Sequence, residues 1–410
     1  MNNDVVVIGG GAAGMFAAIN AARAGHSVTL LEKNPQLGKK LNITGKGRCN
    51  LTNNCDFDTL MANIPKNSRF LYSAFSKFSP QDVMRFFEEL GVELKTERGA
   101  RVFPMSDQAR EITEALRAEL SGVGVLVKCA AARHILTKEG RVIGVACDTG
   151  EIQCNSVILA TGGVSYPTTG STGDGYRMAS ELGHSILPLE ASLVPLVADT
   201  ETCVKLQGLT LKNIVLSVFN NKGKRVFEDL GEMLFTHFGV SGPLVLSASS
   251  HMRDIAHNKF TLSIDMKPGL DAAKLSARIL RDFDERKNSN LQNALGGLLP
   301  SKMIPVIIER LDISPDIKVH SVSREKRHEL AVMLKNFTLL VHDKRPISEA
   351  VITSGGVKTS EIDPKTMKSK LVKGLSFAGE IIDVDAYTGG FNLQIAWSTA
   401  YVAGMNCEES

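Results

Sequence analysis

The hydrophobic pattern opens with an unbroken apolar run over Val5–Ile8, which is followed at once by a cluster of glycines. A run of β-branched residues of this kind is typical of a strand that is buried on both faces of a parallel sheet. Alanines then recur up to Gly25 and favour a slender helix. A second apolar run, Ser27–Leu31, ends on Glu32. The start of the chain therefore predicts a strand–helix–strand unit.

The glycines of this unit have the spacing Gly9-x-Gly11-x-x-Gly14, which is typical of a turn that binds a dinucleotide. Gly9 permits the tight turn, Gly11 allows the backbone to approach a pyrophosphate, and Gly14 allows the helix to pack closely on the sheet. The first helical turn, with Ala12 and Ala13, would direct free N–H groups at the phosphates. The acid that ends the second strand would accept hydrogen bonds from an adenosine ribose. A cofactor-free α/β domain is the alternative interpretation.

The segments that follow continue the α/β pattern. Helices are expected over 79–90, 107–120 and 174–182, and strands over 123–128, 142–147 and 152–159. The last strand stops at Ala160-Thr161-Gly162-Gly163, where small residues let the chain pass close beneath a cofactor. Residues 33–54 are dense in glycine, lysine and asparagine. They are expected to form a loop over the cofactor, with a solvated basic loop as the alternative.

The character of the chain changes at Pro188 and changes back near residue 346. Between these points, short β-rich runs are followed by a helical pattern over about 271–334. We therefore expect residues 1–187 and 346–410 to form one domain, and residues 188–345 to form an inserted substrate or cap domain.

The last segment returns to the opening style and supplies a second strand that ends in an acid, Glu380, and a second helix N-terminus near Leu393. A nicotinamide dinucleotide does not need these groups, whereas the ribityl and isoalloxazine end of FAD does. The pattern therefore favours FAD over NAD as the bound cofactor.

Composition excludes several classes of protein. The 410 residues are 43% hydrophobic and 22% charged with a net charge of +3, which is typical of a globular protein and does not demand nucleic acid as a partner. The seven cysteines are scattered and include no Cys-x-x-Cys, so a disulfide framework, a zinc site and a dithiol redox centre are unsupported. Because the sequence shows no basic leader and no apolar span of about 18 residues, we expect a cytoplasmic protein without a membrane or metal partner.

The motifs resemble those of the BaiN/RdsA-type flavoproteins, also called aminoacetone-oxidase-like FAD-binding proteins, within the glutathione-reductase-like FAD superfamily. The resemblance covers essentially the whole chain. IGGGAAG and ILATGG are shared across the superfamily, whereas GKKLNITGKGRCNLTN, FTHFGVSGP and FAGEIIDVDAYTGGFNLQ are narrow. The resemblance implies an α/β fold in which a Rossmann-like, glutathione-reductase-type FAD domain is interrupted by an inserted β-barrel-like domain with a helical lobe.

The resemblance also implies where FAD would bind. Glu32 would hold the adenosine ribose, and Gly379 and Glu380 the pyrophosphate–ribityl region. Asn392 and Leu393 would present backbone N–H groups to the flavin ring. The full set of expected cofactor-binding residues is Gly9, Gly11, Ala12, Ala13, Gly14, Glu32, Lys33, Lys40, Gly45, Arg48, Cys49, Asn50, Ala131, Thr161, Gly162, Gly379, Glu380, Asn392 and Leu393.

Proteins of this resemblance reduce conjugated C=C bonds of steroid-like enones, form dihydrouridine in ribosomal RNA, or oxidise small amines. We favour an NAD(P)H-driven reductase of an enone of the steroid or bile-acid type. A reductase of ribosomal RNA and an oxygen-using amine oxidase are the alternatives, and FAD as a purely structural element is another. Since no second complete Gly-x-Gly-x-x-Gly unit follows, NADH or NADPH would visit only transiently. The substrate, the preferred nucleotide and the oligomeric state stay open.

Enone reduction needs a donor to the enolate oxygen and an acid for the α-carbon. Arg48 is the candidate donor, and Cys49, His237 or Tyr387 the candidate acid. A buried packing role is the alternative for Cys49, and a locally hydrogen-bonded turn residue is the alternative for His237. A ribosomal RNA substrate would require basic side chains on one face, for which the candidates are Lys66, Arg69, Lys77, Lys212, Lys222, Lys224 and Arg225.

Overall fold

The computed structural model describes residues 4–408, and the chain divides into two compact units. The first unit combines Met1–Ser192 with Ile347–Ser410, and the second is Leu193–Pro346. The first break falls after Ser192 because strand β11 (Ile186–Ser192) pairs with β18 (Ile352–Val357) of the same unit. Pro188, expected to open the inserted domain, lies in β11 where the register shifts between Leu187 and Glu190, a place that tolerates a missing N–H.

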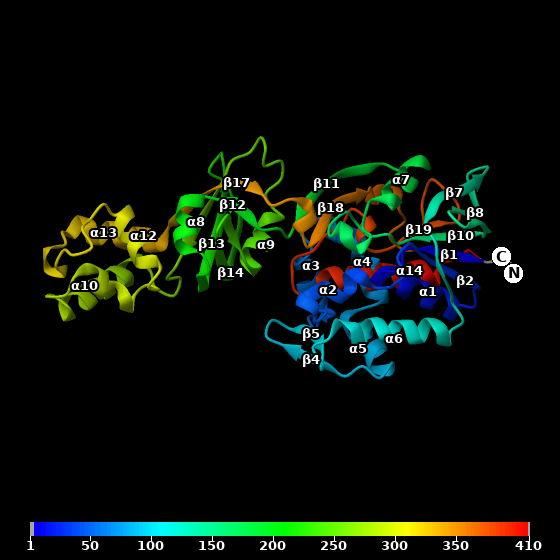
Figure 1. The fold of residues 1–410 in the computed structure, drawn as a ribbon, viewed down its shortest axis with the longest axis horizontal. Coiled ribbons are helices and arrows are strands. Elements are labelled where there is room, and N and C mark those ends of the chain that lie inside the picture. The colour runs from blue at the N-terminus through cyan, green and yellow to red at the C-terminus, as the bar shows by residue number, and fades with distance from the viewer. Residues whose placement is uncertain (1–3, 409–410) are drawn as a thin grey trace. The chain divides into compact units, whose positions relative to one another are not determined.

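A five-stranded parallel sheet forms the centre of the first unit (Figure 1). Its order is β19-β10-β1-β2-β6, with β1 Val5–Ile8, β2 Val28–Glu32, β6 Leu126–Cys129, β10 Ser156–Leu159 and β19 Leu375–Phe377. The chain proceeds from β1 to β2 and β6 on one side, and to β10 and β19 on the other. In parallel sheets of this kind, ligands bind outside the carboxyl ends of the strands where the order reverses. The topology therefore points to the end of β1.

Two helices pack against each other beside this sheet, α1 (Ala12–Arg23) and α14 (Phe391–Met405), drawn blue and red in Figure 1. A Cβ added to Gly404 would lie 2.6 Å from the carbonyl oxygen of Ala17, so the two backbones meet closely. The fully buried Trp397 packs edge-on to Phe16 at 5.5 Å and donates through Nε1 to the Leu51 carbonyl (2.9 Å). Because α14 is buried on nearly all sides, its apolar sequence shows no polar face.

The remaining elements of the first unit surround this core. Besides the β11–β18 pair, two three-stranded antiparallel sheets are present, ordered β3-β5-β4 and β7-β8-β9. Their strands are β3 Thr52–Asn53, β4 Leu94–Glu97, β5 Arg101–Pro104, β7 Ala132–Lys138, β8 Arg141–Cys147 and β9 Gly150–Gln153. The helices are α2 Lys39–Gly47, α3 Phe57–Ala62, α4 Ser68–Lys77, α5 Pro80–Glu89, α6 Ala109–Gly122 and α7 Asp174–Glu181.

The segment 33–54, expected to be a loop, contains helix α2. The helix is interrupted, because Thr44, Gly45 and Lys46 have non-helical backbone angles, with φ of 57° at Gly45 and 59° at Lys46. Gly45, one of the glycines that suggested a loop, lies at this break.

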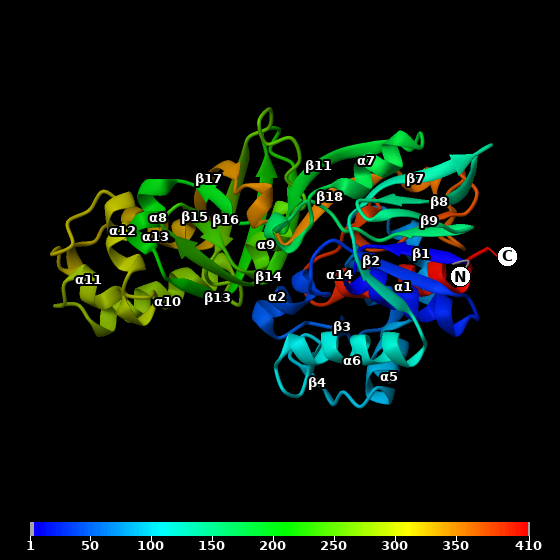
Figure 2. The same ribbon diagram turned by 45° about the vertical axis from the view of Figure 1, so that its right-hand side comes forward.

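The second unit is a closed barrel that carries a helical lobe (Figure 2). The barrel order is β12-β15-β14-β13-β16-β17, and along β16 the inward residues Phe260, Leu262 and Ile264 alternate with less buried ones. Its strands are β12 Leu196–Ala198, β13 Thr210–Asn220, β14 Arg225–Thr236, β15 Gly239–Ser241, β16 Phe260–Asp265 and β17 Phe337–Lys344. Its helices are α8 Thr200–Leu206, α9 Pro243–Ser249, and in the lobe α10 Ala272–Glu285, α11 Leu291–Ala294, α12 Met303–Arg310 and α13 Arg324–Lys335.

The predicted architecture, a Rossmann-like unit interrupted by a barrel with a helical lobe, is confirmed. Within residues 4–408, no helix is both long enough and apolar enough to span a bilayer.

Candidate functional site

The carboxyl ends of the five parallel strands bring together the motifs expected to bind a cofactor. Gly9 follows β1, Glu32 ends β2, Ala131 lies just beyond β6, Thr161 lies just beyond β10, and Gly379 lies just beyond β19. These residues are far apart in sequence, and the parallel order of the sheet alone places them at one edge. This edge is the candidate site.

The glycine-rich turn has the space that a dinucleotide needs. Gly9 has φ of 107°, and a Cβ there would lie 2.6 Å from the carbonyl oxygen of Ala160; a Cβ on Gly14 would lie 1.7 Å from the carbonyl oxygen of Gly9. At Gly11, by contrast, no described atom beyond its immediate neighbours in the chain lies within 4 Å of the Cβ position. Close packing on the sheet side and free space at Gly11 fit a pyrophosphate placed before the N-terminus of α1.

Glu32 is fixed in place by three hydrogen bonds. Its Oε2 accepts from the Gly10 N–H (2.7 Å), and its Oε1 accepts from the N–H and side-chain amide of Asn34 (2.8 and 2.7 Å). An ionised carboxylate has about four acceptor positions, so it retains capacity for a ribose hydroxyl. The side chain is oriented before any ligand binds.

The second half of the chain meets the glycine-rich turn at Gly379. This residue has φ of 75°, and a Cβ would lie 2.7 Å from the Cβ of Ala13. Its N–H donates to Thr399 Oγ1 of α14 (2.9 Å). A glycine is therefore required where the segment after β19 crosses the start of α1, and this contact joins both halves of the candidate FAD site.

Glu380 stands at the centre of a polar cluster beside this crossing. Its Oε2 accepts from Lys40 Nζ (2.7 Å), and its Oε1 accepts from the Thr353 N–H (2.9 Å) and Ser165 Oγ (3.2 Å). Lys40 Nζ also contacts Ser165 Oγ at 2.7 Å. Lys40 and Glu380 are each 21% exposed in their side chains, so a ligand can still reach them.

The N-terminus of α14 is held close to the segment around Asn50. The Asn392 side chain accepts from the Ala386 N–H (3.0 Å) and donates to the Ala386 carbonyl (2.9 Å), which fixes the loop before the helix. Asn50 lies 3.0 Å from the Gly390 N–H through its amide oxygen. The first backbone N–H groups of this 15-residue helix, including that of Leu393, are available to a ligand by their position.

Sequence reasoning missed two buried aspartates in the same loop. Asp383 and Asp385 are 1% and 3% exposed. Asp383 forms an ion pair with Lys66 and accepts from Asn67 Nδ2 (3.0 Å), and Asp385 accepts from Ser192 Oγ (2.9 Å). The signal was present in the sequence, since two acids interrupt an apolar stretch after Glu380.

The structure gives Arg48 and Cys49 well-defined surroundings. The Arg48 guanidinium donates to Asp107 Oδ1 (2.8 Å through Nε), pairs with Glu97, and lies 4.1 Å from the Phe103 ring centroid. These hydrogen bonds raise the pKa of Arg48 and occupy its donors. Burial raises the pKa of the Cys49 thiol to about 12, so the thiol is neutral at ordinary pH. The catalytic and cofactor-binding roles expected for Arg48 and Cys49 stay predictions.

Tyr387 and His237 belong to different units. The Tyr387 N–H donates to the Asn63 carbonyl (3.0 Å), which places this residue on the loop that leads into α14. His237 is exposed at the turn between β14 and β15 of the barrel unit, with its ring edge-on to Phe238 at 5.1 Å. Tyr387 therefore lies in the same unit as the candidate site, whereas His237 lies in the barrel unit, and the role of each as an acid stays a prediction.

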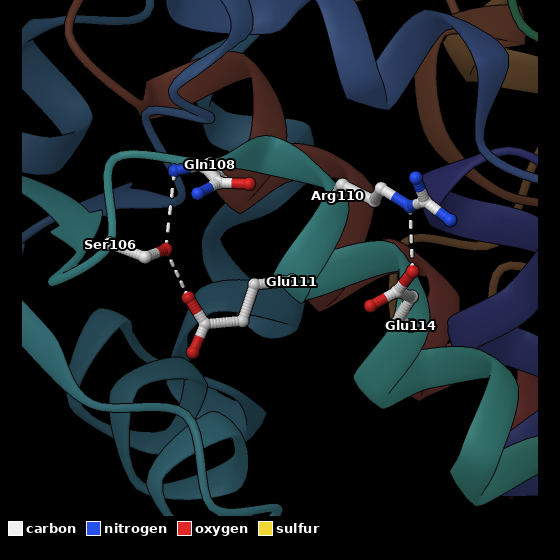
Figure 3. Close-up of a pocket in the computed structure, with 5 residues that line it drawn as sticks. All are labelled: Ser106, Gln108, Arg110, Glu111 and Glu114. Atoms are coloured by element: carbon white, nitrogen blue, oxygen red, sulfur yellow. Dashed lines mark hydrogen bonds and ion pairs between the residues drawn. The ribbon is translucent and has the colours of Figure 1, made fainter.

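A surface hollow at the N-terminus of α6 is separate from these motifs (Figure 3). Its side chains are mostly exposed and satisfy one another: Ser106 Oγ pairs with Glu111, and Arg110 Nε donates to Glu114 (2.6 Å). These are the bonds of a helix start and of neighbouring turns. Across residues 4–408, no group of three or more His, Cys, Asp or Glu side chains could hold a metal ion.

Comparison with known proteins gives matches along the whole chain. The family model described as HI0933-like protein Rossmann domain matches residues 3–406. A 3-dehydro-bile acid delta(4,6)-reductase of Clostridium scindens is 32% identical over 413 residues, covering 99% of each chain. A ribosomal RNA dihydrouridine synthase of Haemophilus influenzae is 30% identical over 410 residues, covering 98% of this chain and 97% of its own.

One solved structure supports the fold alone. It is a 3-ketosteroid delta1-dehydrogenase from Sterolibacterium denitrificans in complex with 1,4-androstadiene-3,17-dione, with a TM-score of 0.54 and 14% identity over 98% of each chain.

Proposed function

Because this chain belongs to the HI0933-like family of FAD-dependent oxidoreductases, we propose that it reduces a conjugated C=C bond in an enone of the steroid or bile-acid type. The observation that carries this proposal is the match to the bile acid reductase of Clostridium scindens, which covers 99% of both chains. The similarity therefore includes the inserted barrel unit as well as the Rossmann-like unit, and a cap domain is where substrate differences are expected.

FAD, when bound, supplies a hydride to the substrate. The residues of this chain would hold the cofactor and manage protons. The carboxylates of Glu32 and Glu380, which are both oriented by hydrogen bonds before binding, would take hydroxyl groups of the ribose and ribityl chain. The α14 N-terminus, where Asn392 and Leu393 lie, would face the flavin ring with its backbone N–H groups.

Reduction of the enone requires a hydrogen-bond donor to the enolate oxygen and an acid that protonates the α-carbon. The guanidinium of Arg48 already pairs with Glu97 and Asp107. We therefore propose that backbone N–H groups, and not Arg48, donate hydrogen bonds to the enolate oxygen. Tyr387 is the preferred acid, because its hydroxyl-bearing side chain is only partly buried and lies on the loop beside α14. The neutral Cys49 thiol carries a proton, but its full burial favours a packing role.

The electron donor would be NADH or NADPH, and it would visit transiently. This part of the proposal is supported by two features of residues 4–408. Every other sheet there is antiparallel, so none forms a second dinucleotide-binding unit, and the cysteines include no Cys-x-x-Cys that could act as a dithiol relay.

Formation of dihydrouridine in ribosomal RNA is the second candidate, and the match to the Haemophilus influenzae enzyme favours it. Some of the basic side chains that RNA binding would require are engaged in contacts within the first unit, and others are exposed on the barrel unit. Lys66 is paired with Asp383, and Lys77 Nζ donates to the Lys365 carbonyl (2.8 Å). In the barrel unit, Lys222, Lys224 and Arg225 are exposed at the β13–β14 turn.

The test is anaerobic stopped-flow reduction of the purified protein by NADH or NADPH, followed by mixing with a steroid enone, with ribosomal RNA that lacks dihydrouridine, or with oxygen. The proposal expects the enone to reoxidise the flavin much faster than RNA or oxygen does. Faster reoxidation by RNA would replace the enone with the second candidate. Reoxidation by oxygen alone, with peroxide formed from a small amine, would support the oxidase alternative and overturn the proposal.

A further inference from the structure

Two chain segments lie on opposite sides of the glycine-rich turn. The segment after β2 starts at Lys33, and the segment after β10 starts at Ala160; β1 lies between these strands in the sheet. A Cβ on Gly10 would lie 2.4 Å from Leu37 Cδ2, and a Cβ on Gly9 would lie 2.6 Å from the Ala160 carbonyl oxygen. Each segment is therefore packed against one of the first two positions of the turn.

The same two segments meet again further along, through four side chains of residues 33–40. Lys33 Nζ contacts Asp174 Oδ2 (2.6 Å) and Thr172 Oγ1 (2.5 Å). The three other bridges are Asn34 Nδ2 to the Thr169 carbonyl (3.2 Å), Lys39 Nζ to the Thr168 carbonyl (3.1 Å) and Lys40 Nζ to Ser165 Oγ (2.7 Å). All four join residues more than a hundred positions apart in sequence, so they are tertiary contacts.

The backbone of the second segment is shaped for this meeting. Gly170 has φ of 106°, and a Cβ there would lie 2.4 Å from Asn34 Nδ2. Ser165 and Ser171 are buried, whereas Pro167, Thr168 and Thr172 are exposed. Residues 165–174 therefore run along the surface with one face turned inward and the other toward solvent.

The two segments thus surround the turn: packing against Gly9 and Gly10 holds them at one end, and the four bridges join them further along. We propose that residues 33–40 and 165–174 form a clasp through which the dinucleotide passes, with its pyrophosphate at the open space beside Gly11. FAD carries a bulky group at each end, so neither end slips through a closed ring. The bridges must open each time FAD enters or leaves.

This clasp makes a kinetic prediction that a simple contact does not. A side chain that only touches FAD stabilises the complex, so its loss speeds release and leaves binding nearly unchanged. A bridge that must open before FAD moves in either direction raises both barriers, so its loss speeds binding and release together. The dissociation constant then changes little. The inference rests on FAD binding by the family and is independent of the proposed substrate.

The experiment compares Lys33→Glu, Asp174→Lys and the double variant with the wild-type protein. FAD release is followed by the fluorescence of free flavin after dilution of the holoprotein, and FAD binding by its quenching on mixing with the apoprotein. We expect each single variant to raise both rate constants about threefold to tenfold, as suits a partly exposed ion pair, with a dissociation constant within about twofold of wild type. The double variant, which restores the pair with reversed charges, returns both rates toward wild type.

Arg110→Glu is the matched control, because Arg110 forms an ion pair of 2.6 Å with Glu114 within helix α6; neither rate should change. Lys39→Ala, which removes a bridge to a carbonyl without placing an acid there, provides a second variant with the same expected direction. The clasp is overturned if release alone becomes faster and affinity falls in proportion, which would make Lys33 a direct ligand. Unchanged rates in Lys33→Glu and Lys39→Ala would overturn it as well. These measurements of FAD binding and release use no substrate, so their result does not depend on whether the protein reduces an enone.

Discussion

Burial raises the pKa of the Cys49 thiol to about 12, so this side chain remains protonated at the pH values used for thiol chemistry. The thiolate is the reactive form, and Cys49 has no exposed surface. We expect iodoacetamide at pH 8 to modify the exposed Cys129 first and to leave Cys49 unmodified in the folded protein. Peptide mass spectrometry measures this, and unfolded protein, in which all seven cysteines react, is the control. Rapid labelling of Cys49 would show that its thiol is accessible and would restore Cys49 as a candidate for the catalytic acid.

Glu32 combines two tasks, since its carboxylate both orders the turn and offers acceptors to a ribose. We expect Glu32→Ala to weaken FAD binding roughly 10- to 100-fold, because hydrogen bonds to a charged group are lost and the Gly10 N–H loses its partner. A titration of apoprotein with FAD measures the change. Glu139→Gln, at an exposed turn before Gly140, is the control and should bind as wild type. Equal affinity in Glu32→Ala would remove the ribose assignment.

At the scale of elements, Arg48 ties the end of α2 to the β4–β5 hairpin. Hydrogen bonding from Arg48 lowers the pKa of Glu97, and bonds from Lys95 and then Arg48 lower that of Asp107. A carboxylate with a lowered pKa in the folded state stabilises the fold above its unfolded pKa, which is about 4, and this contribution disappears as pH falls through the folded value.

Arg48→Met, which keeps an apolar stem over Phe103, should therefore lower the melting temperature at pH 7, and the gap to wild type should shrink as pH falls from 5 to 3. Thermal melts at a series of pH values measure the gap. Arg110→Met, at a pair inside one helix, should show a small gap throughout. A gap for Arg48→Met that is constant with pH would show that packing, and not charge, carries its effect.

The α1–α14 contact predicts a second effect on stability. A methyl group at Gly404 would meet the Ala17 carbonyl oxygen at 2.6 Å and Asn20 Cβ at 2.9 Å, and backbone cannot move aside without cost. Gly404→Ala should destabilise the first unit by about 1–3 kcal/mol, as overpacking does, which urea unfolding measures. Gly122→Ala in α6, where the new methyl group meets only Glu119 Oε2 at 4.0 Å, is the control and should be neutral or slightly stabilising. Equal behaviour of the two variants would contradict the close packing.

At the scale of the whole molecule, the two candidate substrates make different demands on the barrel unit. Binding of ribosomal RNA would need the basic side chains of the barrel unit, whereas binding of a small enone would not. We expect Lys222→Glu with Lys224→Glu to leave enone-driven reoxidation of the flavin within about twofold of wild type, because these side chains lie at an exposed turn and surface charges act weakly on a neutral ligand. Stopped-flow reoxidation with each substrate decides the matter. A selective loss of the RNA reaction, with a steep dependence on salt, would favour the second candidate.

Sequence alone was sufficient wherever local pattern determines structure. The β1–turn–α1 unit and Glu32 follow from residues that are neighbours in the chain, and the helical lobe follows from periodicity. The closure of the barrel does not, because β12 and β15 are only three residues long each and pairing between distant strands leaves no local signal. The partners of Arg48 lie 49 and 59 residues away, so the sequence could suggest a free donor where the fold has two ion pairs.

The pairing of β11 with β18 has a consequence for how such proteins diversify. Ser192 and Ile352 are opposite each other in the register, so the insertion Leu193–Pro346 departs from and returns to one point of the first unit. If that insertion were excised, residues 347–351 would connect the two strands, and five residues is an ordinary length for a hairpin loop. The barrel with its lobe is thus an insertion in the loop of a β-hairpin. Such an insertion can be replaced by another domain during evolution without a change in the strand order of the Rossmann-like sheet.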